Sequence, residues 1–123
     1  ENRTTAIRIP GGDLASKRIE HRVAGGDTNP YLVMAAILGS ALLGIEKKLT
    51  PIKPAMNNAY SNGAENLALN WEDAINYFEN NKEIKQIFSN DLIENLVRTK
   101  RQELNEFKKI ESSKHWKYYV SAI

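Results

Sequence analysis

The sequence feature that most constrains the fold of this chain is a run from Tyr31 to Leu49 that is apolar almost all round. Its apolar residues are Tyr31, Leu32, Val33, Met34, Ala35, Ala36, Ile37, Leu38, Ala41, Leu42, Leu43 and Ile45. Placed on a helix, these positions cover every face, and such a helix is either buried in a larger protein or spans a membrane. The run therefore predicts a helix that needs apolar surroundings on all sides.

Two features of the run favour burial in protein over a membrane. The charged segment 46–48 and the small residues Gly39 and Gly44 shorten the strongly apolar part to about fifteen residues, below the roughly 20 that a spanning helix needs. At its start, Asn29 and Pro30 are typical of an N-cap and a first helical residue. We therefore predict a helix that is buried in a larger protein, and no transmembrane segment.

Helical patterns also fill most of the chain after residue 70. Asn70 is expected to cap a helix over 71–80, and a short helix over 82–88 follows. The longest helix is expected over 91–110. Its apolar stripe comprises Leu92, Ile93, Leu96, Val97, Leu104, Phe107 and Ile110.

Two further segments complete the C-terminal part. Residues 50–69, with Gly63 and several prolines and asparagines, form a long irregular connection, which usually marks a functional loop or a missing partner surface. A last helix follows a cap at Ser112 or Ser113. Its apolar residues Trp116, Tyr119 and Val120 are expected to pack back onto the core.

The N-terminal part has the alternation of β-strands. Residues 4–9 and 17–24 are predicted as two strands, joined by a turn that includes Pro10 and Gly12. Two strands alone are marginally stable, so we expect this antiparallel hairpin to belong to a larger sheet. The predicted fold class is α+β and mostly α: an N-terminal β-hairpin over 1–28, then a bundle of about four to five helices over 29–123.

The second strand has an unusual charged face. Because side chains alternate along a strand, Arg18, Glu20 and Arg22 share one face, with apolar residues and His21 on the other. One interpretation is a solvated sheet edge with cross-strand ion pairs. The other is the wall of a polar cavity, in which the carboxylate holds a cation and the arginines hold anions. The strand alone leaves both open.

Composition excludes several functional classes. The formal charge of +2 is too small for an anionic partner such as nucleic acid, and the basic residues of segment 98–109 alternate with glutamates in a pattern typical of a solvated, ion-paired face. Without cysteine there are no disulfides or thiolate metal sites. No secretory signal is visible, and the start at Glu1 without methionine leads us to expect a fragment of a longer chain.

Several motifs, in order along the chain, carry a resemblance to a known family. They are Asn2-Arg3-Thr4, Arg8-Ile9-Pro10, Arg18-Ile19-Glu20-His21-Arg22, Asn29-Pro30-Tyr31-Leu32, Asn70-Trp71 and the run from Asn95 to Glu103. With these motifs the chain resembles the C-terminal part of the glutamine synthetase catalytic domain. The resemblance covers residues 1–123, and it implies that residues 1–28 are active-site strands and 29–123 a helical region.

The resemblance implies an activity and its cofactors. Family enzymes use ATP and Mg²⁺ or Mn²⁺ to join ammonia or an amine to the γ-carboxylate of glutamate through γ-glutamyl phosphate. Their active site lies in a barrel-like funnel of strands shared between neighbouring subunits of a homo-oligomeric ring. The expected partners are therefore these small molecules, with no nucleic acid and no membrane, in a cytoplasmic enzyme.

The resemblance also implies roles for individual residues. Glu20 would bind the metal that bridges the ATP phosphates, and Arg22 would hold the glutamate γ-carboxylate as it becomes an acyl phosphate. Arg8 and Arg3 would contact the nucleotide phosphates and the phosphoryl group in transfer, with Lys17 or Arg18 near the nucleotide. These residue types suit the chemistry, because phosphoryl transfer needs positioned positive charge and a hard cation needs carboxylate oxygen.

The resemblance leaves the substrate and the state of the isolated chain as expectations. After Arg22, many ammonia-using members read Phe-Pro-Asp, whereas this chain has Val23-Ala24-Gly25, which is more similar to the branch that uses polyamines or alkylamines. Because the other metal ligands and glutamate-binding groups would lie upstream, we expect no ligase activity from this chain alone. We also expect self-association through exposed apolar faces, or a helical core with a loosely held N-terminus. The alternative is a non-catalytic helical interaction or scaffold module.

Overall fold

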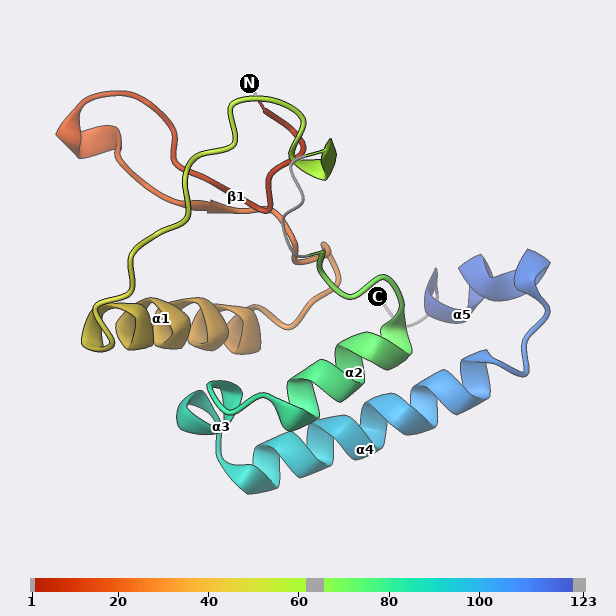
Figure 1. Cartoon of the computed structure of the whole chain (residues 1–123). Coiled ribbons are helices and arrows are strands. Elements are labelled where there is room, and N and C mark those ends of the chain that lie inside the picture. The colour runs from red at the N-terminus through yellow and green to blue at the C-terminus, as the bar shows by residue number, and fades with distance from the viewer. Residues whose placement is uncertain (1, 62–65, 121–123) are drawn as a thin grey trace.

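The computed structural model describes residues 2–61 and 66–120, which form a short hairpin followed by helices (Figure 1). The strands are β1 (Ile7–Arg8) and β2 (Glu20–His21), and the helices are α1 (Pro30–Glu46), α2 (Trp71–Asn80), α3 (Ile84–Ile87), α4 (Asn90–Phe107) and α5 (His115–Val120). Short 3₁₀ turns lie at Leu14–Ser16, Ala59–Ser61 and Ser112–Lys114. The predicted mostly helical α+β class is confirmed.

The hairpin is much shorter than the predicted strands over 4–9 and 17–24. Its antiparallel register pairs Ile7 with His21 and Arg8 with Glu20. The connection departs from extended structure at Gly12, whose φ of 140° suits glycine, and at a 3₁₀ turn whose Asp13 side chain accepts from the Ser16 amide at 2.9 Å. With no third strand beside it in the described chain, pairing is limited to these positions.

Helix α1 begins as predicted and ends three residues early. The Asn29 side chain accepts hydrogen bonds from the amides of Tyr31 and Leu32, at 3.0 and 3.2 Å, which satisfies two donors of the first turn. At the other end, Lys48 has a left-handed φ of 51°, and the Leu49 amide donates to the Gly44 carbonyl at 2.9 Å. This pattern closes the helix at Glu46 instead of Leu49.

None of the residues of α1 is buried in this chain, as expected for a helix whose apolar surroundings lie in a larger protein; burial in that larger protein stays a prediction. The contact of α1 with the other helices is made chiefly by α3, where Ile87 packs over Gly39. Five of its large apolar residues are 53–83% exposed, and its others are half-buried. The five exposed residues are Tyr31, Met34, Leu38, Leu42 and Ile45. No helix among the described residues is long and apolar enough to cross a membrane.

The core lies where α2 and α4 run side by side, with the segment around α3 closing one end (Figure 1). The buried apolar residues are Ile75, Phe88, Ile93, Val97 and Leu104. Three of them belong to the predicted stripe of α4, which is therefore confirmed. Asn70 and Ser89 cap α2 and α4 by accepting from the amides of Asp73 and Leu92.

Ion pairs cover the polar side of α4, as the alternating charges predicted. Three of them join residues one turn apart: Arg98–Glu94, Lys100–Glu103 and Lys109–Glu106. Two others cross to α2: Arg101–Glu79 at 2.6 Å and Lys108–Glu72 at 2.9 Å. This face is a solvated surface that also ties the two helices together.

The C-terminal helix differs from the prediction that its apolar residues enter the core. Trp116 is 64% and Val120 65% exposed, while the side chain of Tyr119 lies outside the described residues, as does Gly63 of the preceding long connection. His115 instead makes a contact with the end of α4, where its ring lies against Phe107 with centroids 4.1 Å apart. The predicted serine cap is also absent at the described 3₁₀ turn, which has Glu111 at its N-cap position and no side-chain cap.

Candidate functional site

The charged face of the hairpin gathers three arginines around one carboxylate. Because Arg8 lies directly opposite Glu20 in the register, the two side chains share a face with Arg18 and Arg22. Glu20 Oε2 lies 3.4 Å from Arg8 Nε and 3.5 Å from Arg22 Nη2, and Glu20 Oε1 lies 3.1 Å from Arg18 Nη2. We call these four residues the arginine cluster.

The arginine cluster is partly shielded from water and has an excess of positive charge. The side chains of Arg8, Glu20 and Arg22 are only 26–29% exposed, whereas that of Arg18 is 58% exposed. Three guanidinium groups face a single carboxylate, so the cluster remains attractive to a further anion. Guanidinium forks match the geometry of carboxylates and phosphates, which are the anions this arrangement suits.

A second set of contacts fixes the position of Arg22. Its Nη1 donates to the Asn2 carbonyl at 2.8 Å, and its backbone amide donates to the Ala6 carbonyl at 2.9 Å. The Asn2 side chain in turn donates to the Asn57 carbonyl at 2.7 Å. These bonds link Arg22 through the N-terminal segment to the connection that follows α1.

Thr4 strengthens the same link. Its hydroxyl accepts from the Ala59 amide at 2.8 Å and donates to Asn2 Oδ1 at 2.6 Å. Sequence reasoning assigned no role to Asn2 or Thr4 beyond their place in a motif, because their partners lie more than 50 residues away in the chain. Only the tertiary structure shows that they hold the segment around residues 57–59 beside the arginine cluster.

The structure brings together some of the predicted site residues and leaves others apart. Arg8, Glu20 and Arg22 meet, and Arg18 joins them. Arg3 is exposed in a turn, and no ion pair of the described residues joins it to Glu20. Lys17 is also exposed. The cluster therefore contains three of the four residues that were expected to bind metal, glutamate or phosphate.

The described residues do not form a divalent-metal site by themselves. Mg²⁺ and Mn²⁺ need several oxygen ligands, and nowhere in the described ranges do three or more acidic, histidine or cysteine residues gather in a way that could hold a metal. Glu20 is the single carboxylate of the arginine cluster, and both of its oxygens already contact guanidinium groups. The arrangement fits an anion, and for a metal it offers one ligand.

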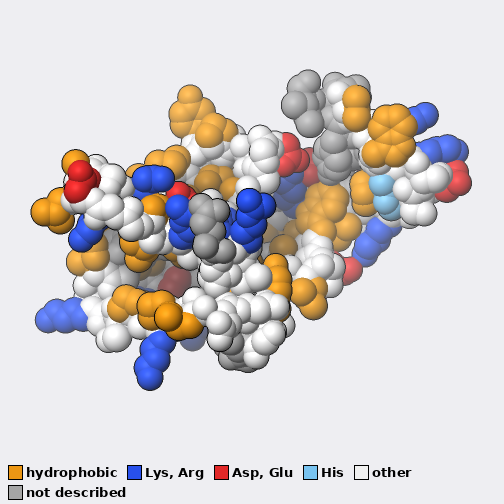
Figure 2. Space-filling view, turned by 90° about the horizontal axis from the view of Figure 1, so that it is seen from above, with side chains coloured by type: hydrophobic (Ala, Val, Ile, Leu, Met, Phe, Trp, Pro, Cys, Tyr) orange, Lys and Arg blue, Asp and Glu red, His pale blue; other side chains and the backbone are white. Residues whose placement is uncertain are grey.

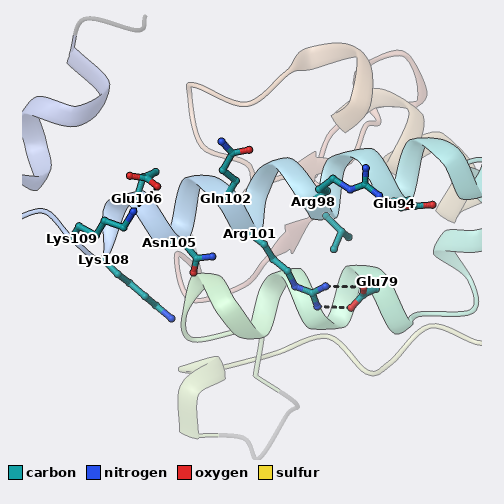
Figure 3. Close-up of a pocket in the computed structure, with 10 residues that line it drawn as sticks. Glu79, Glu94, Arg98, Arg101, Gln102, Asn105, Glu106, Lys108 and Lys109 are labelled. Atoms are coloured by element: carbon teal, nitrogen blue, oxygen red, sulfur yellow. Dashed lines mark hydrogen bonds and ion pairs between the residues drawn. The ribbon is translucent and has the colours of Figure 1, made fainter.

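A second polar region lies along α4, well apart from the arginine cluster in the chain (Figure 3). It is an open hollow of about 860 Å³ beside Glu79, Arg98, Arg101 and neighbouring residues of α4. Figure 3 shows Arg101 reaching across to Glu79, to which it donates two hydrogen bonds of 2.9 and 2.6 Å. These bonds lower the pKa of the Glu79 carboxyl and raise the pKa of Arg101. Because its charges are satisfied by one another, this hollow has the character of a structural surface.

Comparison with known proteins agrees with the geometry of the hairpin. The family model described as "Glutamine synthetase, catalytic domain" matches residues 1–119. The chain is 38% identical over 109 residues to glutamate–isopropylamine ligase of a Pseudomonas species, covering 86% of this chain and 24% of that protein. It is 36% identical over 113 residues to γ-glutamylputrescine synthetase PuuA of Escherichia coli K12, covering 89% and 23%. Glutamine synthetase of Clostridium saccharobutylicum is 32% identical over 116 residues, covering 88% and 26%. The chain thus spans about a quarter of the length of these relatives.

Proposed function

Because the chain belongs to the glutamine synthetase family, we propose that its arginine cluster is one wall of the active site of an ATP-dependent ligase that joins an amine to the γ-carboxylate of glutamate. The observation that carries this proposal is the contact of three guanidinium groups with Glu20 at 3.1–3.5 Å on one face of the hairpin. An interaction module has no need to gather like charges at this density around a single carboxylate.

The proposed reaction places negative charge where the cluster has positive charge. The γ-carboxylate of glutamate attacks the γ-phosphorus of ATP, ADP leaves, and the acyl phosphate is then attacked by the amine with loss of phosphate and a proton. Arg22 is proposed to hold the γ-carboxylate, and Arg8 to contact the phosphoryl oxygens during transfer. Preorganised cations around those oxygens are the main means by which proteins accelerate phosphoryl transfer.

Arg3 and Glu20 have more peripheral roles in the proposal. Arg3 lies outside the cluster, so we assign it to the outer phosphates of the nucleotide. Glu20 would provide one oxygen ligand for the Mg²⁺ or Mn²⁺ that accompanies ATP, and the remaining ligands would come from outside the described residues. A bound divalent ion would neutralise phosphate charge, as the arginines do. A carboxylate that binds this ion would therefore lie among the arginines, where Glu20 lies.

For the second substrate we propose an amine larger than ammonia. Two of the relatives described above are named for isopropylamine and putrescine, and both are more similar to this chain than the clostridial glutamine synthetase is. The segment Val23-Ala24-Gly25 after Arg22 points the same way. Strict use of ammonia in a panel of amines, tested on a full-length ligase that carries this segment, would remove the amine assignment.

The test is a chimera in which this chain replaces the 113 matching residues of the E. coli γ-glutamylputrescine synthetase. We expect it to form γ-glutamylputrescine from ATP, glutamate and putrescine. Glu20→Gln, Arg8→Gln and Arg22→Lys should each lower kcat/KM on the order of 100-fold or more, because each removes a charge or a bidentate contact at the reacting groups. The purified 123-residue chain alone should form no product.

The matched control for these variants is Arg98→Gln. It also removes an arginine that pairs with a glutamate, but this pair lies within α4 and is exposed. It should leave kcat/KM within about twofold, as expected for a surface ion pair. An active chimera in which the Glu20, Arg8 and Arg22 variants behave like Arg98→Gln would refute the assignment and favour the interaction module.

A further inference from the structure

The side chain of Asn2 makes four hydrogen bonds beside the arginine cluster. Its amide nitrogen donates to the carbonyls of Asn57 at 2.7 Å and Ala55 at 3.4 Å. Its Oδ1 accepts from the hydroxyl of Thr4 at 2.6 Å and from the amide of Thr4 at 3.0 Å. An asparagine side chain has two N–H donors and one oxygen with two lone pairs, so these bonds use its full capacity. Asn2 is therefore fixed both in position and in the orientation of its amide.

Thr4 extends the same network to the connection that follows α1. Its hydroxyl accepts from the Ala59 amide at 2.8 Å, so the hydroxyl's own hydrogen is directed to Asn2 Oδ1. Successive hydrogen bonds of this kind polarise and strengthen one another. Both side chains are half-buried, and on the far side they contact only backbone atoms, those of residues 55, 57 and 59. We call this set of bonds the Asn2–Thr4 network.

The backbone of Asn2 holds the guanidinium of Arg22. Arg22 Nη1 donates to the Asn2 carbonyl at 2.8 Å, and the Thr5 hydroxyl donates to the same carbonyl at 3.3 Å. The other terminal nitrogen of Arg22 lies 3.5 Å from Glu20 Oε2. A carbonyl is neutral, so it orients the guanidinium without cancelling its charge. Seen from above in Figure 2, Lys and Arg side chains gather at the surface over the hairpin.

We propose that Asn2 and Thr4 are positioning residues for Arg22 and thereby for glutamate. This inference rests on the proposed function, in which Arg22 holds the γ-carboxylate. An arginine side chain has several freely rotating bonds, and ordering them when the substrate binds costs affinity. The Asn2–Thr4 network meets this cost during folding, because it fixes the carbonyl on which Arg22 Nη1 lies. Neither residue touches the substrate, and both act through Arg22.

The first test measures KM for glutamate and for ATP in a full-length ligase that carries this chain, such as the chimera described above. Asn2→Ala removes four hydrogen bonds and no charge. It should raise KM for glutamate on the order of 10-fold and leave KM for ATP within about twofold, because it misplaces the arginine that holds glutamate. Thr4→Val should change KM for glutamate in the same direction, and Thr4→Ser, which keeps the hydroxyl, should restore it.

The matched control for Asn2→Ala is Asn80→Ala. The Asn80 side chain also donates to a backbone carbonyl, that of Asn76 at 2.9 Å, but this bond lies on the exposed surface of α2. Asn80→Ala should therefore leave both KM values unchanged. An equal rise of the two KM values in Asn2→Ala would indicate a general loss of structure and would overturn the positioning role.

The second test determines whether Asn2 acts through Arg22. Asn2→Ala is combined with Arg22→Lys, which removes the planar fork that lies between the Asn2 carbonyl and Glu20. In the Arg22→Lys background, Asn2→Ala should lower kcat/KM for glutamate by less than about twofold, against about 10-fold or more when Arg22 is present. Effects that multiply would show that the two residues act independently, and the inference would be wrong.

The outcomes also separate this inference from the proposed function. If Arg22→Lys lowers kcat/KM while Asn2→Ala and Thr4→Val behave like Asn80→Ala, the positioning role is refuted and the role of Arg22 stands. If Arg22→Lys has no effect, the proposed function fails and this inference fails with it. If circular dichroism shows that Asn2→Ala does not fold, the two Thr4 variants decide. Equal KM values for glutamate in Thr4→Val and Thr4→Ser would then refute the inference.

Discussion

Two glycines in the same helix provide a sharp test of how α1 is held against α3. A Cβ added to Gly39 would lie 2.7 Å from Cγ2 and 2.9 Å from Cγ1 of Ile87. A Cβ added to Gly44 would meet nothing within 4 Å. Gly39→Ala and Gly44→Ala are therefore the same chemical change in a covered and in an open position of one helix.

The expected stability changes have opposite signs. Replacing glycine by alanine inside a helix gains about 1 kcal/mol, because alanine loses less backbone entropy on folding. For Gly44→Ala this gain should appear nearly in full, reduced by its position in the last turn. For Gly39→Ala the new methyl group meets both γ carbons of Ile87, which can move away only by a change of the χ1 rotamer or a shift of the backbone. Overpacking of this kind costs about 1–3 kcal/mol. The net change should be a loss of up to about 2 kcal/mol.

The measurement is urea unfolding followed by circular dichroism at 222 nm, with the free energy of unfolding compared between the two variants. We expect Gly44→Ala to be more stable than Gly39→Ala by about 1–3 kcal/mol. The double variant Gly39→Ala with Ile87→Ala should recover the part of the loss that comes from the clash. If Gly39→Ala stabilises the chain as much as Gly44→Ala does, α3 does not cover this face of α1.

Three further predictions follow from the polar contacts. Arg101 and Lys108 hydrogen-bond Glu79 and Glu72, and these bonds lower the pKa of both carboxyls from the ordinary value of 4.5. Because their pKa is lower in the folded state, these carboxyls stabilise the folded chain at pH values above their unfolded pKa. The free energy of unfolding should therefore fall as the pH drops below about 4.5. In Glu79→Gln, the urea midpoint should change less across that pH range. Arg101→Ala should lower the urea midpoint more than Arg98→Ala, because Arg101 ties α4 to α2 while Arg98 pairs within α4; equal midpoints would contradict the cross-helix contact. Thr4→Val should speed hydrogen exchange at the Ala59 amide and leave the Leu92 amide, capped by Ser89, unchanged; unaltered exchange at Ala59 would show that Thr4 does not hold the connection.

The arginine cluster shows how far sequence reasoning reaches at the candidate site. The alternation of a strand was enough to place Arg18, Glu20 and Arg22 on one face, because it depends on neighbouring residues alone. The approach of Arg8 to Glu20 depends on the register between two strands, which the separate strand patterns do not contain. The same holds for Asn2 and Thr4, whose partners lie at residues 57 and 59. That this face is a cavity wall and not a solvated edge stays a proposal, supported by the family relationship and by the partial burial of Arg8, Glu20 and Arg22.

The sequence by itself determined where α1 and α2 begin and which face of α4 is buried. Asn29 and Asn70 cap α1 and α2 as their positions predicted, and the stripe of α4 supplies three of the five buried core residues. These features are local: a cap bonds to amides two or three residues away, and an amphipathic helix selects its buried face by periodicity.

Only the tertiary structure decided which apolar surfaces find a partner within this chain. Trp116 was predicted to pack onto the core but is 64% exposed, whereas the neighbouring His115 lies against Phe107. The reason is that burial depends on what lies opposite a surface, and opposing surfaces come from distant parts of the chain or from another molecule. The apolar pattern of α1 predicts that the helix needs apolar partners, and in this chain α3 covers one face of it and leaves other apolar side chains, such as Leu38 and Leu42, exposed.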